Sequence, residues 1–256
     1  MKVSIITVCY NSEATIEDTI KSVKDQRYKN IEYIIIDGDS KDNTNQIIRD
    51  YSDIVDIHIS EKDKGLYDAM NKGINIATGD VIGILNSDDF FPHSDVISDI
   101  VHGFEYNTRM VYTDLLYVKE NSPHAPVRLW KSKPFERRLL GCSWIPPHPT
   151  FYARRELFDE LGGYDIRNKL AADYELLLRF FIKYGSTSKY LEFTSVHMRC
   201  GGESNNSWKN IIKQNKEVYS AAKKHNVKVN FLRFFALKFG RKVLEAYRAK
   251  KTTGAI

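Results

Sequence analysis

Four short apolar runs rich in Val and Ile recur in the first 85 residues, and segments of helical periodicity separate them. The runs are Val3–Cys9, Ile31–Ile36, Ile54–Ile59 and Val81–Leu85. Apolar residues recur at helical spacing after Ser12, over Asp42–Tyr51 and over Leu66–Ala77. Strands that alternate with such helices predict βαβ units. Right-handed crossovers then give an α/β fold with a Rossmann-like, doubly wound, mainly parallel sheet.

The regular alternation of strands and helices ends after about residue 110. Strands are expected over Met110–Val118, Ala125–Trp130 and Tyr190–Met198, and helices over Arg154–Leu161 and Ala172–Tyr184. Residues 146–149 hold three prolines, which predict a stiff extended loop. We therefore expect one catalytic domain over 1–206, made of a half over 1–110 and a smaller half over 111–206, and then a basic helical extension over 207–256.

Basic residues gather at the C-terminal end. Residues 209–256 carry 13 basic and 2 acidic residues, whereas the whole chain has 38 and 33. Two helices are expected there, over 207–225 and 230–249, and the second mixes basic residues with Phe231, Phe234, Phe235 and Phe239. Apolar residues with basic flanks suit a helix that lies on an anionic membrane, so we expect 228–251 to bind such a surface.

Two alternatives remain for this tail. It can pack against the catalytic domain or against a second subunit in a homo-oligomer. Nucleic acid is not expected as a partner, because contacts to phosphates do not need the phenylalanines.

No apolar run reaches the roughly 18–20 residues that a membrane-spanning helix needs. The apolar start of the chain is too short for a signal peptide and has no small-residue cleavage site. The three cysteines, Cys9, Cys142 and Cys200, form no disulfide framework, which suits a reducing compartment. We expect a cytoplasmic protein, peripheral at the inner face of the membrane.

Polar side chains follow each of the four N-terminal strands. They are Tyr10 after the first, Asp37 and Asp39 after the second, Asp63 after the third, and Asp88 and Asp89 after the fourth. Ligands of an open parallel sheet bind beyond these strand ends. Carboxylates gathered there repel one another unless a cation lies among them. A divalent Mg²⁺ or Mn²⁺ ion shared with substrate phosphates meets that need. Taken singly, Asp39 reads equally well as a turn residue.

Six motifs resemble, in order and spacing, those of family 2 glycosyltransferases with the GT-A fold. VSIITVCYNS, IIIDGDSKDNT, DKGLYDAMNKGINIATGD and VIGILNSDD resemble the nucleotide-binding half, and HPTFYARRELFDELGGYD and AADYELLLR resemble the second half. The resemblance covers about residues 2–205. It implies a nucleotide-sugar-binding half over 1–110 and an acceptor half, with the catalytic base, over 111–206.

By this resemblance, three strand-end loops contribute residues near the nucleotide. Tyr10 lies where the family stacks or flanks the nucleobase. Asp37 or Asp39 lies in the acidic loop that contacts the base. Asp63 and Lys64 match a loop near the nucleotide and the donor sugar.

The resemblance also places the donor sugar and the metal. Asp68 is expected to cap a helix or to contact the sugar. Asp88 matches the carboxylate that touches the ribose, and Asp89 matches the metal ligand. Asn86 stands where the family usually has a first acid. His197 is an additional candidate ligand of the metal.

Three residues of the second half are expected on the acceptor side. Asp173 matches the catalytic base of the family, and a carboxylate that is partly buried among apolar neighbours suits that role. A plain helix cap is the alternative for Asp173, and the two roles are compatible. His148 in the proline loop and Trp144 at its entrance are expected close to a sugar, with core packing as the alternative for each.

The resemblance implies a metal-dependent, inverting glycosyltransferase in surface polysaccharide biosynthesis. Its donor would be a nucleotide-diphosphate sugar, with UDP as the expected nucleotide, and its acceptor a saccharide or a lipid-linked saccharide. One carboxylate base without a second, nucleophilic carboxylate favours inversion by a single displacement.

Two other functions stay open. A nucleotidyltransferase that makes sugar nucleotides would need a Gly- and basic-rich loop after the first strand, where this chain has CYNSEATIED. A non-catalytic binding protein with a basic tail would have no need of Asp173.

Overall fold

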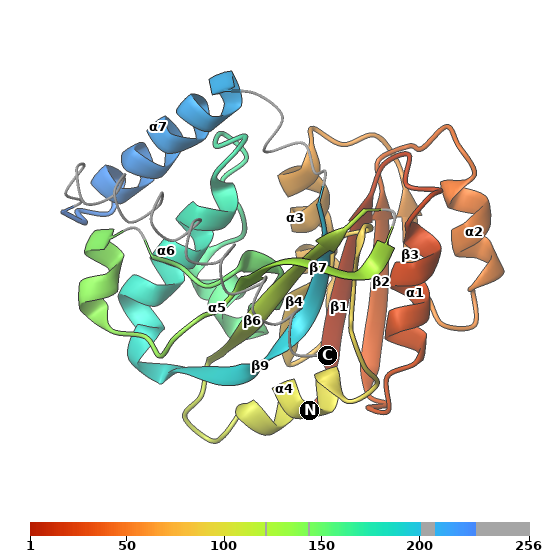
Figure 1. The fold of residues 1–256 in the computed structure, drawn as a ribbon, viewed down its shortest axis with the longest axis horizontal. Coiled ribbons are helices and arrows are strands. Elements are labelled where there is room, and N and C mark those ends of the chain that lie inside the picture. The colour runs from red at the N-terminus through yellow and green to blue at the C-terminus, as the bar shows by residue number, and fades with distance from the viewer. Residues whose placement is uncertain (121, 143, 201–207, 229–256) are drawn as a thin grey trace.

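A computed structural model describes residues 1–120, 122–142, 144–200 and 208–228 (Figure 1). Its strands are β1 Val3–Cys9, β2 Ile31–Asp37, β3 Ile57–Ser60, β4 Val81–Ile84, β5 Asp89–Phe90, β6 Met110–Lys119, β7 Ser122–Trp130, β8 Tyr152–Arg154 and β9 Ser188–Arg199. They form one sheet in the order β3-β2-β1-β4-β8-β6-β9-β5, and β7 pairs with β6. The expected α/β architecture is therefore confirmed.

The N-terminal half of the sheet is parallel. β1 pairs in parallel with β2 and with β4, and β2 pairs in parallel with β3. The chain builds outward from β1 to β3 and then returns to place β4 on the other side of β1. The order of the strands thus reverses between β1 and β4, and this switch point is where open sheets bind ligands.

Helices cover both faces of the sheet. They are α1 Ile16–Lys24, α2 Thr44–Asp50, α3 Leu66–Ile76, α4 Val96–Gly103, α5 Arg155–Leu161, α6 Ala172–Tyr184 and α7 Trp208–Lys224. Successive residues of a strand point to opposite faces, so Ile5 packs with α1 and α4 while Ile6 packs with α3 and α6. Burial on both faces explains why the N-terminal strands read as unbroken apolar runs.

The second half of the sheet is mixed. β8 is antiparallel to β4 and β6, β7 is antiparallel to β6, and only β9 runs parallel to β6. Some predicted bounds were wrong: β3 begins at Ile57, β7 begins at Ser122, and α4 was not predicted. The proline loop ends in a short 3-10 turn over His148–Thr150.

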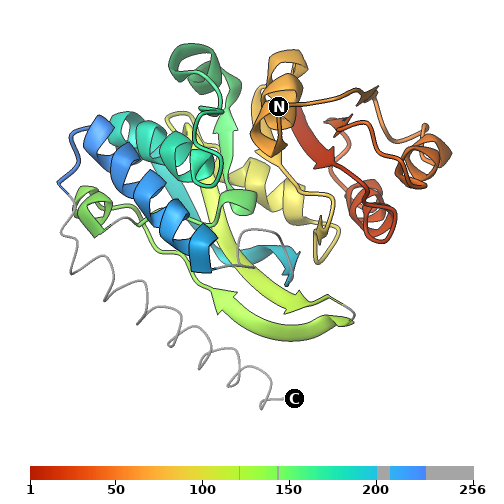
Figure 2. The same ribbon diagram turned by 90° about the horizontal axis from the view of Figure 1, so that it is seen from above.

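The predicted first basic helix is confirmed as α7, and it lies alongside α6 (Figures 1 and 2). Val218, Ala221 and Ala222 of α7 are buried in the same core as α6. The predicted helix over 230–249, and nearly all of the proposed membrane-binding segment 228–251, lie outside the described residues. Within the described ranges, no helix has the length and hydropathy of a membrane span.

A buried carboxylate ties together the amino ends of β1 and β2 and the approach to β4. Glu32 accepts hydrogen bonds from Lys2 Nζ at 2.6 Å, from Ser4 Oγ at 2.5 Å and from the backbone N–H of Thr78 at 2.8 Å. Burial alone would raise the pKa of Glu32, but these donors lower it from 4.5 to about 2. The cluster lies at the opposite ends of the strands from the polar residues that follow them.

We predict that Glu32→Gln destabilises the fold above pH 4.5 by about 2 kcal/mol, since a lowered pKa measures how strongly the fold favours the carboxylate. Stability of this origin is present above the unfolded pKa and is lost as the pH falls through the folded pKa. The gap to wild type should therefore narrow between pH 4.5 and pH 2. Urea unfolding at several pH values measures it, with the exposed Glu156→Gln as control. A gap that does not change with pH would contradict this assignment.

Candidate active site

Hydrogen bonds between loops join the carboxyl ends of β1, β2 and β4. Ser12 Oγ lies 2.9 Å from Ser87 Oγ, which links the loop after β1 to the loop after β4. The backbone N–H of Asn11 donates to Ser40 Oγ at 2.8 Å, and Asn11 Oδ1 accepts from the N–H of Lys41 at 2.9 Å. The three loops thus form one polar surface at the switch point.

Tyr10, Gly38 and Asp63 lie next to one another at the carboxyl ends of the strands. Tyr10 is 63% exposed. A Cβ atom at Gly38 would lie 2.7 Å from Asp63 Oδ2 and 3.4 Å from Tyr10 Cδ2. A side chain at position 38 would therefore collide with Asp63, so the close approach of these three residues requires glycine.

Asp37 is fully buried and holds its loop together. Its carboxylate accepts hydrogen bonds from the Ser40 N–H at 3.0 Å, Asn45 Nδ2 at 2.9 Å, Ser60 Oγ at 2.6 Å and Ser40 Oγ. Burial raises the pKa of Asp37, but these donors outweigh it and hold the pKa below its usual value. Its acceptor capacity is filled by the protein. Of the two carboxylates proposed to contact the base, only Asp39 is partly exposed, and it pairs with Lys41 at 2.7 Å.

The loop after β3 is fixed by its own carboxylates. Asp63 Oδ1 accepts from the N–H of Gly65 at 2.7 Å, and Asp68 Oδ2 accepts from the N–H of Lys64 at 2.9 Å. Asp68 therefore ties the loop before α3 to the first turn of this helix. The Lys64 side chain is exposed beside this loop.

The Asp88–Asp89 turn is anchored through its backbone. Arg199 Nη1 donates to the carbonyl of Asp88 at 2.7 Å, and Thr19 Oγ1 donates to the carbonyl of Asp89 at 2.7 Å. The guanidinium of Arg199 also pairs with Asp18 at 2.5 Å. The sequence did not single out Arg199, because only the pairing of β5 with β9 brings it to this turn.

Asp89 of this turn is fully buried, whereas Asp88 is partly buried. Burial raises the pKa of Asp88, and the charge of Arg199 opposes the rise. Burial, and then the charge of Asp88, raise the pKa of Asp89 well above its usual value. Asn86 Nδ2 donates to Asp89 Oδ2 at 3.0 Å. Among the described residues, Asn86 Oδ1 and Asp89 Oδ1 are buried and accept no hydrogen bond.

These two oxygens fit a divalent cation, because a carboxylate and an amide oxygen are ligands that Mg²⁺ and Mn²⁺ accept. His197, the additional candidate ligand of the metal, lies one register position away from Asp89 and so points to the other face of the sheet. Phe90 pairs with His197 and Asp89 with Met198, and the rings of Phe90 and His197 meet edge to face at 5.4 Å. In the described ranges, no group of three or more His, Cys, Asp and Glu side chains could hold a metal.

Asp173 lies in the first turn of α6 and is half-buried. Its Oδ1 accepts from the N–H of Tyr174 at 2.8 Å and from the hydroxyl of Tyr67 at 3.3 Å. Tyr67 belongs to the first turn of α3, directly after the loop of Asp63. Both hydrogen bonds of this carboxylate in the described part of the chain fall on Oδ1, so Oδ2 accepts none there.

The other two acceptor-side candidates have different surroundings. His148 Nε2 lies 2.5 Å from the hydroxyl of Tyr164. Burial lowers the pKa of His148, and the charge of Asp173 opposes that change. Trp144 is buried in an aromatic cluster, with Tyr112 at 6.0 Å and Phe181 at 5.9 Å between ring centroids. Trp144 therefore packs in the core, which is the second of the two roles expected for it, and does not present its ring to a sugar.

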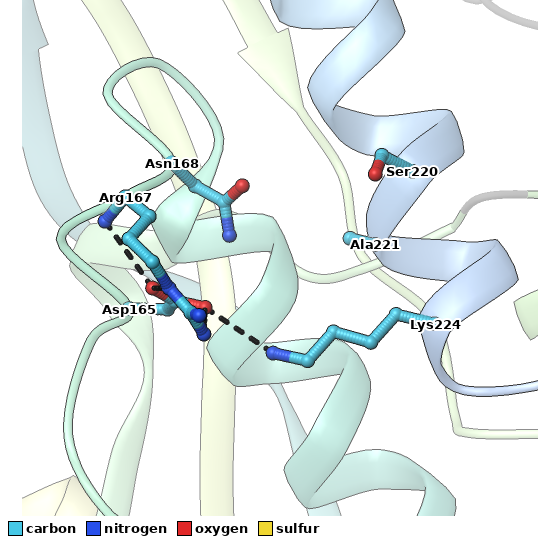
Figure 3. Close-up of a pocket in the computed structure, with 6 residues that line it drawn as sticks. All are labelled: Asp165, Arg167, Asn168, Ser220, Ala221 and Lys224. Carbon is cyan, nitrogen blue, oxygen red and sulfur yellow. Dashed lines mark hydrogen bonds and ion pairs between the residues drawn. The ribbon is translucent and has the colours of Figure 1, made fainter.

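One hollow, of about 230 Å³, lies between the loop after Tyr164 and α7 (Figure 3). In it the carboxylate of Asp165 pairs with Arg167 at 2.8 Å and with Lys224 at 3.2 Å. Lys224 also pairs with the buried Glu175 of α6 at 3.2 Å. These ion pairs hold α7 against the loop. Because the charges that line the hollow are paired with one another, it is a poor candidate for a site that binds a charged ligand.

Comparison with known proteins gives a family for this arrangement. The family model described as glycosyl transferase family 2 matches residues 4–164. The Bacillus subtilis glycosyltransferase TuaG, named for teichuronic acid biosynthesis, is 30% identical over 218 residues, which are 81% of this chain and 83% of TuaG.

Solved structures share the fold. Staphylococcus aureus TarS, residues 1–349, in complex with UDP-GlcNAc, has a TM-score of 0.65 at 17% identity and covers 92% of this chain and 73% of its own. Mycobacterium tuberculosis glucosyl-3-phosphoglycerate synthase, in complex with Mn²⁺, UDP-glucose and phosphoglyceric acid, has a TM-score of 0.58 at 19% identity. It covers 85% of this chain and 80% of its own.

Proposed function

The chain belongs to glycosyl transferase family 2 and is a glycosyltransferase with the GT-A fold, and we propose that it moves a sugar from a UDP-sugar onto a saccharide with inversion at the sugar carbon. One observation carries this proposal. The partly buried carboxylate of Asp173 meets the start of α3, beside the strand-end loops that bind the ligands of such sheets.

The donor part of the proposal concerns Tyr10 and its neighbours Gly38 and Asp63. The exposed Tyr10 suits stacking on a flat base, and Asp63 Oδ2, which lies near Gly38, suits acceptance of a hydrogen bond from an N–H group of that base. The UDP-sugars bound to TarS and to the mycobacterial synthase support uracil as that base. Asp39, Lys64 and Asp88 complete the proposed donor site.

A divalent cation, Mn²⁺ or Mg²⁺, belongs to the proposal, with Asp89 as its ligand and Asn86 beside it. The two buried oxygens without a hydrogen bond in the described residues support this assignment, as does the Mn²⁺ in the complex of the mycobacterial synthase. When bound, the cation neutralises charge that develops on the leaving diphosphate.

The proposed reaction is one displacement. The acceptor hydroxyl gives its proton to Oδ2 of Asp173 while its oxygen bonds to C1 of the sugar. The bond between C1 and the diphosphate oxygen breaks at the same time, and UDP leaves with the electron pair. A single base and attack from the face opposite the leaving group give inversion.

The acceptor and the place of action are proposed on the likeness to TuaG. A saccharide that grows in surface polysaccharide biosynthesis, free or lipid-linked, is the acceptor that this likeness supports. A lipid-linked acceptor would place the enzyme peripherally at the cytoplasmic face of the membrane, with 228–251 on anionic lipid.

We predict that Asp173→Asn lowers sugar transfer by roughly 10²–10⁴-fold, because the acceptor hydroxyl loses its base. UDP affinity should stay close to wild type, because the base contacts the acceptor and not the nucleotide. UDP release and calorimetric UDP binding measure the two effects, and Asp159→Asn, an exposed carboxylate of α5, is the control. An equal loss of UDP affinity would make Asp173 a structural residue.

The metal assignment predicts that Asp89→Asn lowers transfer by roughly 10²–10³-fold. The fold should survive, because the variant removes a charge that is costly to bury. EDTA should reduce the wild-type rate in the same way, and added Mn²⁺ should restore it. Asp95→Asn, an exposed carboxylate outside the site, is the matched control. Normal turnover of the chelated wild-type enzyme would refute the assignment.

A further inference from the structure

One face of α3 carries Tyr67 and Asn71, which stand four residues apart and so lie one above the other. Asn71 holds the backbone of Tyr164 from both sides: its Nδ2 donates to the carbonyl at 2.9 Å, and its Oδ1 accepts from the N–H at 2.8 Å. A Cβ atom at the neighbouring Gly163 would lie 2.2 Å from Asn71 Oδ1. The loop before α6 is thus docked closely on α3.

The docked loop brings the ring of Tyr164 onto the ring of Tyr67. The two rings stack with their centroids 5.4 Å apart and their planes at 27°. The hydroxyl of Tyr164 is fixed in turn by His148 Nε2 at 2.5 Å. Both the backbone and the ring of Tyr164 are therefore restrained, and Tyr67 has little freedom to turn away.

The hydroxyl of Tyr67 reaches the carboxylate of Asp173 from this restrained position. Burial, and then the charge of Asp173, raise the pKa of Tyr67 well above its usual value, so the hydroxyl keeps its proton and donates. The distance of 3.3 Å is long for such a bond, and catalytic hydrogen bonds often shorten once the substrate is bound.

We propose that Tyr67 is the positioning residue of the catalytic base: its hydroxyl fixes Oδ1 of Asp173, so that Oδ2 faces the acceptor hydroxyl. This inference rests on the proposed function. Asn71, Tyr164 and His148 support Tyr67 through the contacts described above. The start of α3 also carries the loop of Asp63 and Lys64, so one rigid helix sets the position of the base relative to the donor site.

Removal of this hydroxyl should lower kcat and leave donor binding unchanged. In Tyr67→Phe we expect a fall of about 10-fold in kcat, because hydrogen bonds to charged groups are of that strength. The KM for the UDP-sugar should stay within about 2-fold of the wild-type value, since Tyr67 is not proposed to contact the donor. The control is Tyr184→Phe. Tyr184 is the last residue of α6, and its hydroxyl donates to the carboxylate of Glu160 in α5. Loss of this hydrogen bond, which lies at the other end of α6 from Asp173, should leave kcat unchanged.

A double-mutant cycle separates positioning from general damage to the fold. If Tyr67 acts through Asp173, Tyr67→Phe should cost about 10-fold in the wild-type background and almost nothing in the Asp173→Asn background. Thermal unfolding of the four proteins serves to check that all are folded. Tyr164→Phe keeps the stacked ring but releases His148, and we expect a smaller loss of kcat than in Tyr67→Phe.

The outcomes distinguish this inference from the function on which it rests. An equal loss in both backgrounds, or full activity of Tyr67→Phe, overturns the positioning role while the base assignment stands. Full activity of Asp173→Asn overturns the base assignment itself, whatever Tyr67→Phe does.

Discussion

The parallel pairing of β1 with β2 and with β4 is the constraint on which the active site depends. Parallel strands end at the same edge, so residues after Cys9, Asp37 and Ile84 meet although they are distant in sequence. Burial of both faces of these strands stabilises the pairing, because a slip by one residue would exchange the side chains that pack in the two cores. The Glu32 cluster secures the amino ends of the strands, which leaves the carboxyl ends free to carry polar loops.

The carboxylates at this edge differ in how the protein compensates them. Asp37 is surrounded by donors and stays ionised as part of the loop structure. Asp89 is fully buried beside the charge of Asp88, and only Asn86 and Arg199 oppose the rise of its pKa, so an added cation would stabilise its carboxylate. Asp173 keeps one oxygen in hydrogen bonds and the other available. The same type of side chain is thus proposed for three different roles, according to its neighbours.

Much of the fold follows from the local sequence, and the contacts of the site do not. Apolar periodicity predicts β1, β2, α3 and α6 because their burial pattern repeats along the chain. It cannot choose between Asp37 and Asp39, since two of the donors that fix Asp37, Asn45 and Ser60, come from α2 and β3. A tryptophan suits a hydrophobic core as well as a sugar-binding surface, so the residue type alone does not predict where Trp144 lies. Tyr67, Tyr164 and Arg199 act through partners about 100 or more residues away, which no local pattern reports.

Release of UDP from a panel of sugar nucleotides in the presence of Mn²⁺ tests the central claim most directly. A glycosyltransferase built around this edge should bind UDP, and should release it from one or a few UDP-sugars at a rate that rises when a suitable saccharide is added. The products should carry the opposite anomeric configuration from the donor. Failure to bind UDP, together with no release of nucleotide from any donor in the panel, would contradict the account.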